Sequence, residues 1–129
     1  MASLDIADDT FIFGDARMVA RMVNEPARHE LWWPGWTLHV SRDRGRQGVQ
    51  WQVGGRWAGR SWSGTMEIWL EGVLHGVVLH HYVRLDPLGP ALLAKEATSL
   101  NVTYVTGWKR HVFALKDEVE ATPIVRARS

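Results

Sequence analysis

Apolar and polar side chains alternate along most of the segment from Trp36 to Leu85, and this period of two is typical of β-strands with one buried face. The alternation is interrupted by polar or glycine-rich turns at residues 43–48, 54–55 and 72–76. We therefore expect four strands, at residues 36–41, 49–53, 57–71 and 77–85. Because the turns are short, consecutive strands should pair antiparallel and form a meander.

The alternation assigns these strand residues to a dry face and a wet face, as in an antiparallel sheet with one solvated side. The dry face is expected to carry Trp36, Leu38, Val40, Val49, Trp51, Val53, Trp62, Gly64, Met66, Ile68, Leu70, Val77, Leu79, His81, Val83 and Leu85. An apolar sheet face must be covered by another element, and the C-terminal part of the chain offers one.

Residues 91–120 have apolar side chains at spacings of three and four, which predicts a long amphipathic helix. Its apolar positions are Leu93, Ala97, Leu100, Tyr104, Trp108, Val112, Leu115 and Val119, and its polar side carries Lys95, Lys109, Lys116 and Glu120. Asn101-Val102-Thr103 and Gly107 are poor helix formers, so a kink or break at residues 99–107 is an alternative to one continuous helix.

A strand and two short helices are expected before the meander. Residues 3–13 read as a strand, which Gly14-Asp15 ends, and Asp15 is a good N-cap for a helix over 16–24. Pro26 interrupts that helix, and a second one is expected over 27–31. The whole chain is therefore expected to be α+β, with one domain over 1–122 and a flexible tail over 123–129.

Composition excludes several classes of protein. The chain has 129 residues and a net charge of +1, which is too weak to indicate nucleic-acid binding or an anionic membrane as a partner. It has no cysteine, which excludes disulfides and thiolate chemistry and is compatible with the cytoplasm, the expected location. The N-terminus lacks the pattern of a secretion signal, and no segment is apolar for long enough to insert in a membrane.

The order of elements and four segments resemble the START-like superfamily, also called SRPBCC or helix-grip, in its polyketide cyclase/dehydrase and lipid transport group. The segments are Leu31-Trp32-Trp33-Pro34, residues 64–71 (GTMEIWLE), residues 76–82 (GVVLHHY) and residues 108–117 (WKRHVFALKD). The chain looks most like small actinobacterial members, although its five expected strands are fewer than is usual. The resemblance implies a curved antiparallel sheet wrapped around a long C-terminal helix, with an apolar cavity for lipids, polyketides, sterols or hormones between them.

Seven of the eight tryptophans lie between Trp32 and Trp69, which is more aromatic volume than a core of this size needs. We expect part of it to wall a cavity. The expected ligand-binding residues are Trp36, Trp51, Trp62, Met66, Ile68, Leu79, His81, Tyr104 and Trp108, with Trp32 and Trp33 at the rim.

Three aromatic residues fall on the expected wet face, namely Trp57, Trp69 and Tyr82. Grouped exposed aromatics favour a protein interface, so a homodimer packed through this face is one hypothesis. Simple scatter of surface residues is the alternative. A bulge at Gly59 would instead turn Trp57 inward.

His81 is the ionisable side chain that the alternation places on the dry face. It could act as a catalytic acid or base, or donate a hydrogen bond to a ligand. The alternative is a core histidine bonded to a backbone carbonyl or to Tyr104. A register slip of one residue would turn His80, Tyr82 and Arg84 inward instead.

No metal or cofactor site is expected. His80 and His81 are adjacent on a strand and point to opposite faces, and no zinc-ligand spacing or phosphate-binding glycine motif occurs. The arginines of the hairpins either bind an anion or form a solvated surface. They are Arg42, Arg44, Arg46, Arg56 and Arg60.

Three functions remain open from the sequence. The first is binding of a hydrophobic, aromatic or polyketide/lipid-like small molecule in the apolar cavity. The second is an enzyme of the cyclase or dehydratase type, a lyase or isomerase, that uses His81 as acid or base. The third is a protein-interaction module with a filled core.

Overall fold

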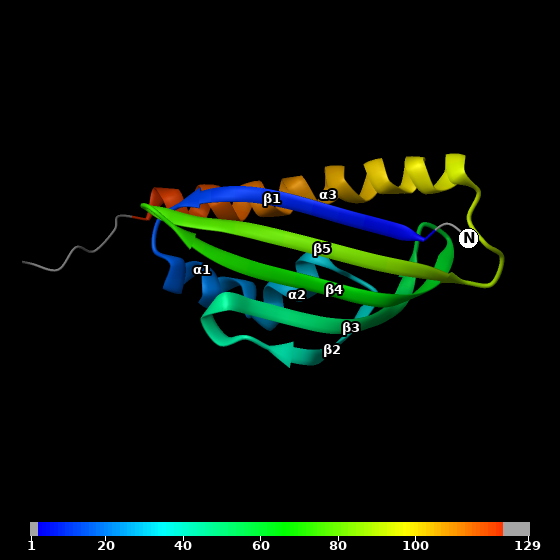
Figure 1. Cartoon of the computed structure of the whole chain (residues 1–129), viewed down its shortest axis with the longest axis horizontal. Coiled ribbons are helices and arrows are strands. Elements are labelled where there is room, and N and C mark those ends of the chain that lie inside the picture. Colours follow the sequence, from blue (N-terminus) through cyan, green and yellow to red (C-terminus); the bar gives the residue numbers. More distant parts are fainter. Residues whose placement is uncertain (1–2, 123–129) are drawn as a thin grey trace, which may run out of the picture.

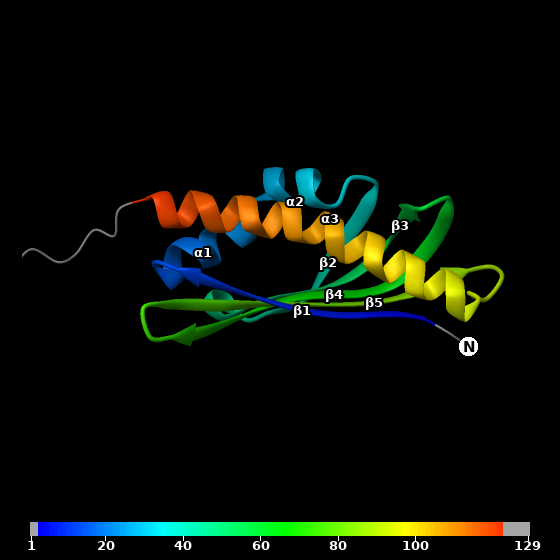
Figure 2. The ribbon, with the colours of Figure 1, turned by 90° about the horizontal axis from the view of Figure 1, so that it is seen from above.

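The computed structural model describes residues 3–122, and the expected flexible tail at 123–129 lies outside them. Five antiparallel strands form one curved sheet with the order β1-β5-β4-β3-β2. Figure 2 shows the long helix α3 lying along one side of this sheet, with the short helices α1 and α2 beside it. The elements in chain order are β1 (Leu4–Phe13), α1 (Ala16–Val23), α2 (Pro26–Trp32), β2 (Trp36–Asp43), a 3-10 turn η1 (Gly45–Gln47), β3 (Gly48–Trp57), β4 (Arg60–Val73), β5 (Gly76–Leu88) and α3 (Ala94–Ala121) (Figure 1).

This arrangement confirms the α+β helix-grip architecture that the sequence predicts. Strand β5 shows why the prediction works: Val77, Leu79, His81, Val83 and Leu85 are all buried beneath the helices. Strand β4 follows the same rule with Trp62, Met66, Ile68 and Leu70. Side chains alternate strictly across a strand, so a regular apolar period identifies the covered face. Asp15 also caps α1 as expected, since its side chain accepts a hydrogen bond from the Arg17 backbone N–H.

The expected turn at Gly54-Gly55 is wrong, because β3 continues through both glycines to Trp57. The hairpin turns instead at Ala58 and Gly59, whose φ angles are 52° and 75°. Two successive residues with positive φ give the short turn that matches strand twist. Gly59 is therefore part of a turn and not a bulge, and Trp57 belongs to β3.

Gly55 is a glycine because the chain at the start of the neighbouring strand β2 comes very close to it. A Cβ atom at Gly55 would lie 2.4 Å from the carbonyl oxygen of Gly35, in the loop that precedes β2. At Gly54 the nearest atom to such a Cβ, the Trp62 carbonyl oxygen, would lie at an ordinary 3.6 Å. Gly55 therefore marks a close approach of two chain segments rather than a turn of the chain.

Two residues expected on the buried side are exposed. Val40 is 60% exposed because β2 is the outermost strand and its register with β3 shifts between Val40 and Arg42. Leu93 is 74% exposed because it precedes the first turn of α3 and occupies the N-cap position. Pattern alone does not reveal where a covering element ends.

Helix α3 is continuous from Ala94 to Ala121, without the break considered at 99–107. Its buried residues are Tyr104, Trp108, Val112, Leu115 and Val119. Lysines on its flank tie it to the edge strand β1: Lys109 donates to the Asp9 carbonyl at 3.0 Å, and Lys116 donates to the Phe11 carbonyl at 2.7 Å. No helix within residues 3–122 combines the length and the apolar character needed to cross a membrane.

Candidate ligand pocket

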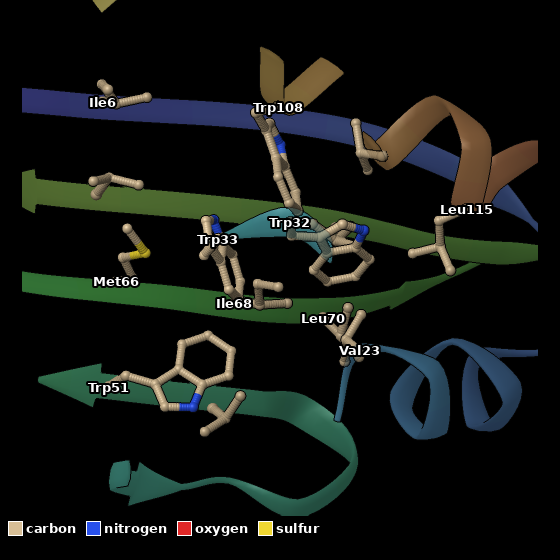
Figure 3. Close-up of a cluster of buried hydrophobic side chains, with 14 of the residues drawn as sticks. Ile6, Val23, Trp32, Trp33, Trp51, Met66, Ile68, Leu70, Trp108 and Leu115 are labelled. Carbon is tan, nitrogen blue, oxygen red and sulfur yellow. The ribbon is translucent and has the colours of Figure 1, made fainter. Parts of the chain in front are cut away.

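Indole rings fill much of the space between the sheet and α3, as Figure 3 shows for Trp32, Trp33 and Trp108. Trp33 stacks on Trp108 with 6.0 Å between ring centroids and an interplanar angle of 7°. Trp32 meets Trp108 edge to face at 5.4 Å, and Trp51 meets Trp33 at 5.3 Å. These are the geometries that aromatic rings prefer, so the rings hold one another in fixed positions.

A chain of hydrogen bonds runs through this cluster from the α2–β2 connection, by way of α3, to the sheet. The Trp33 indole N–H donates to the Tyr104 hydroxyl at 3.0 Å, and that hydroxyl lies 2.8 Å from Nε2 of His81. Nδ1 of His81 lies 3.0 Å from the Glu67 carbonyl oxygen. Because a carbonyl only accepts, Nδ1 carries the proton and Nε2 accepts from Tyr104. The chain therefore has one direction: Trp33 donates to Tyr104, Tyr104 to His81, and His81 to Glu67.

Burial keeps both ionisable members of this chain neutral. Desolvation lowers the pKa of His81 to about 4, and the hydrogen bond to the Glu67 carbonyl opposes this only in part. Desolvation also raises the pKa of the Tyr104 hydroxyl well above its usual range. His81 thus makes both bonds considered for a core histidine, one to a backbone carbonyl and one to Tyr104.

A pocket of about 250 Å³ opens beside this cluster, between α3, the α2–β2 connection and the end of β3. Its lining consists of Leu31, Trp32, Trp33, Pro34, Trp36, Trp57, Thr103, Tyr104, Gly107, Trp108 and His111. Of the expected ligand-binding residues, Trp36, Tyr104 and Trp108 line this pocket. Trp32 and Trp33, which the sequence predicts at the rim of the cavity, also line this pocket.

The other expected ligand-binding residues do not line this pocket. Trp51, Trp62, Met66, Ile68, Leu79 and His81 are buried in the core. Trp62, for example, donates its indole N–H to the Trp57 carbonyl at 2.8 Å. The pocket therefore lies nearer the edge of the helix–sheet interface than the sequence pattern predicts.

Trp57 is the clearest correction among the site residues. The alternation places it on the wet face, but its ring packs edge to face against Tyr104 at 5.9 Å and lines the pocket. The cause is the turn at Ala58-Gly59, which makes Trp57 the last residue of β3 instead of the first residue of β4.

Three further residues of α3 line the pocket that the sequence pattern does not predict there. They are Thr103, Gly107 and His111, which lie four residues apart on one side of the helix. Gly107 is informative because a Cβ atom there would meet no atom within 4 Å apart from its chain neighbours and the backbone of its own helix. Glycine in the middle of a helix costs about 1 kcal/mol relative to alanine, and here it leaves open space at the pocket wall. The sequence signal was present, since Gly107 stands out as a poor helix former.

Trp69 and Tyr82, expected at an interface, lie on the opposite face of the sheet, where Tyr82 is 37% exposed. Trp69 stacks on His80 at 4.5 Å, and His80 bonds to Asp9 and Glu71. His80 and His81 thus face opposite sides of the sheet, as expected.

Of the hairpin arginines, Arg44 pairs with Glu67 and Arg60 with Glu96.

Comparison with known proteins bears on the fold. No protein-family model matches the sequence, and no curated protein matches it. Among solved structures, DynU16 from the dynemicin biosynthetic locus aligns with a TM-score of 0.61 and 12% identity over 88% of this chain. The Aha1 dimer protein of Colwellia psychrerythraea aligns with a TM-score of 0.61 and 15% identity over 94% of this chain and 98% of its own.

A START superfamily protein from Mycobacterium smegmatis aligns over 92% of this chain and 98% of its own, with a TM-score of 0.51 and 10% identity. The fold is START-like. This chain spans about half of DynU16, 48% of its length, whereas it matches the START protein almost end to end. At these identities the likeness concerns the START-like architecture, and function must be argued from the pocket.

Proposed function

We propose that this START-like chain binds a hydrophobic, aromatic small molecule in the pocket between α3, the α2–β2 connection and the end of β3. The observation that carries the proposal is the composition of the walls. Trp33, Trp36, Trp57 and Trp108 surround a space of about 250 Å³ that Gly107 leaves open. Concave sites with apolar aromatic walls and few polar groups are typical of small-molecule binding.

The walls favour a planar ring system over a long acyl chain. Rigid indoles present flat apolar faces, against which an aromatic ligand stacks at little cost in conformational entropy. A cavity of about 150 Å³ is known to hold benzene, so the larger pocket suits a ligand of about two fused rings. A ligand of polyketide type meets these requirements better than a lipid does. That DynU16 comes from a biosynthetic locus supports a small molecule as the ligand.

The cyclase or dehydratase alternative, with His81 as acid or base, stays a prediction. His81 does not line the pocket, and both its ring nitrogens are engaged by Tyr104 and Glu67. Its lowered pKa, about 4, makes it a weak base near neutral pH. These observations favour binding over catalysis by His81, and turnover that is lost in His81→Gln while ligand binding survives would reverse that preference.

The binding proposal can be tested by filling the pocket from its wall. Gly107→Leu places a side chain in the open space, whereas Thr106→Leu adds the same side chain at the neighbouring exposed position. The probe is N-phenyl-1-naphthylamine, a neutral dye that fluoresces in apolar surroundings. We expect the wild type and Thr106→Leu to bind it alike and Gly107→Leu to bind at least tenfold more weakly.

Equal binding by all three proteins would overturn the assignment to this pocket. No binding by the wild type, with this dye or with other two-ring aromatics, would favour the interaction module with a filled core. Circular dichroism on each variant shows whether the fold is retained, and Gly107→Leu is expected to keep it because leucine is a good helix former.

A further inference from the structure

A second hollow of the surface lies between helix α1 and the hairpin that joins β2 to β3. The short turn η1 of that hairpin packs against α1, and Figure 1 shows the two side by side. The hollow has a volume of about 570 Å³ and shares no lining residue with the aromatic pocket. We call it the arginine groove. Its lining consists of Arg17, Ala20, Arg21, Asn24, Asp43, Gly45 and Arg46.

Three guanidinium groups gather in this groove from two separate elements. Arg17 and Arg21 are four residues apart and so share one side of α1, whereas Arg46 comes from η1. All three residues are exposed, so packing of the core does not require them here. Like charges one helical turn apart repel each other. A chain with a net charge of only +1 thus concentrates positive charge in one hollow.

These arginines are poorly paired within the protein. Among residues 3–122, neither Arg21 nor Arg46 has an acidic side chain within ion-pair distance, in contrast to Arg44 of the same hairpin, which pairs with a glutamate. Arg17 reaches Asp15 only at 3.6 Å, and both side chains are exposed, so this pair is weak. The groove therefore offers N–H donors that no internal acceptor uses.

The charge of the lining indicates which anion it suits. Asp43 is the one acidic residue of the lining, and its Oδ1 accepts the Gly45 backbone N–H at 2.8 Å. Three arginines and one aspartate leave a net charge of +2. A phosphate monoester carries a charge of about −2 near neutral pH, whereas a carboxylate or a sulfate ester is singly charged. Guanidinium groups also present paired N–H donors that match phosphate oxygens.

We propose that the arginine groove binds a phosphate monoester, with Arg21 and Arg46 donating to its oxygens from opposite walls and Arg17 adding positive charge. This site is independent of the proposed aromatic pocket. It also separates the hairpin arginines, for which the sequence leaves an anion site and a solvated surface open. Arg46 belongs to an anion site, whereas Arg44 and Arg60 are engaged by glutamates of the chain.

Two probes of nearly the same shape test the charge selectivity. Methyl phosphate is doubly charged at about pH 8, and methyl sulfate is singly charged. Each is titrated into the full chain in a phosphate-free buffer of low salt, because salt screens exposed charges. Binding is followed by ¹⁵N–¹H NMR. We expect methyl phosphate to bind about fivefold more tightly than methyl sulfate or better, and to shift the backbone signals of Gly45 and Arg46.

Matched variants test the location. Arg21→Gln and Arg46→Gln should each weaken the binding of methyl phosphate about five- to tenfold, since each removes a charged hydrogen bond that solvent partly screens. Arg110→Gln gives the control, because it changes the net charge equally at an exposed position of α3 outside the groove. It should bind as the wild type does. Substitutions at such exposed sites have little effect on stability.

A further pair of probes distinguishes a soluble phosphate from a lipid head group. Vesicles of phosphatidylcholine with about one-tenth phosphatidic acid present a monoester, and those with the same share of phosphatidylglycerol present a singly charged diester. Co-sedimentation with the first vesicles alone, lost in Arg46→Gln, would identify a lipid as the source. Binding of methyl phosphate without co-sedimentation would identify a soluble compound.

Three results would overturn the inference. The first is equal binding of methyl phosphate and methyl sulfate. The second is an equal loss of binding in Arg110→Gln and Arg21→Gln, which would show a general attraction to positive charge. The third is a wild type that binds neither methyl phosphate nor the phosphatidic acid vesicles. None of these results affects the proposed function, whose pocket lies elsewhere.

Discussion

The Tyr104 hydroxyl on helix α3 lies 2.8 Å from Nε2 of His81 on strand β5, and the two side chains join the two layers of the fold. Trp33, from the loop after α2, donates to the same hydroxyl at 3.0 Å. One oxygen atom therefore connects three parts of the chain that are far apart in sequence, at the inner end of the pocket.

Removing that oxygen should destabilise the protein. Tyr104→Phe leaves the Trp33 N–H and Nε2 of His81 buried without partners, and an unpaired buried group costs about 1–3 kcal/mol. We expect the free energy of unfolding to fall by about 2–4 kcal/mol in urea denaturation. The half-exposed Tyr82 gives the control, since Tyr82→Phe should change stability by about 0.5 kcal/mol or less. Equal effects of the two substitutions would contradict the bonding chain.

Stability should also fall in mild acid because of His81. Its pKa is about 4 in the folded protein and 6.5 in an unfolded chain, so the unfolded state binds the proton first as the pH falls. The contribution of neutral His81 is fully present above pH 6.5 and declines by about 1.4 kcal/mol per pH unit toward pH 4.

The measurement is urea denaturation at several pH values, on the wild type and on His81→Gln. The difference between the two slopes isolates His81 from His111, whose pKa burial also lowers. Parallel pH profiles for the two proteins would show that His81 does not titrate in this way.

Substitution by alanine should lower the stability of the protein at one of the two adjacent glycines of β3 and leave it unchanged at the other. A Cβ atom at Gly55 would lie 2.4 Å from the Gly35 carbonyl oxygen, whereas at Gly54 the nearest atom would lie at 3.6 Å. We expect Gly55→Ala to cost about 1–3 kcal/mol, in the range of overpacked sites, and Gly54→Ala to be tolerated. Thermal unfolding monitored by circular dichroism compares them directly. If Gly55→Ala is as stable as the wild type, the close approach of the Gly35 carbonyl to Gly55 is wrong.

Gly107→Ala should stabilise the protein. Helix α3 is continuous through Gly107, and the added methyl group meets no atom within 4 Å apart from its chain neighbours and the backbone of its own helix. Replacing a mid-helix glycine by alanine is worth about 0.5–1 kcal/mol, which raises the midpoint of thermal unfolding. A decrease would indicate that the helix bends at Gly107.

The homodimer through Trp69 and Tyr82 stays a prediction that sedimentation can check. If these residues form an interface, the wild type should sediment as a dimer at high concentration, and Trp69→Lys should shift it to a monomer. Phe113→Lys, which changes a half-exposed aromatic on α3, is the matched control and should leave the dimer intact. A wild type that is monomeric at all concentrations would rule the dimer out.

Much of the fold could be predicted from local pattern. The alternation of Val77, Leu79, His81, Val83 and Leu85 identified the covered face of β5, and the spacing of Tyr104, Trp108, Val112 and Leu115 identified the buried side of α3. Such patterns succeed because burial of one face is a property of each element taken alone. The site was predicted less well, since Trp36, Tyr104 and Trp108 line the pocket and the remaining expected ligand residues do not.

The sequence by itself therefore determined the kinds of element, their order and the face that each one buries, because side-chain periodicity and helix capping act within a few residues. Only the tertiary structure decided that β3 runs through Gly54-Gly55, that Trp57 turns inward to the pocket, and that the Trp108 indole N–H has no hydrogen-bond partner within residues 3–122. Each of these depends on which atoms from distant segments meet, such as the Gly35 carbonyl above Gly55 or the Tyr104 hydroxyl between Trp33 and His81. Close packing selects those contacts for the whole molecule at once, and no local pattern records them.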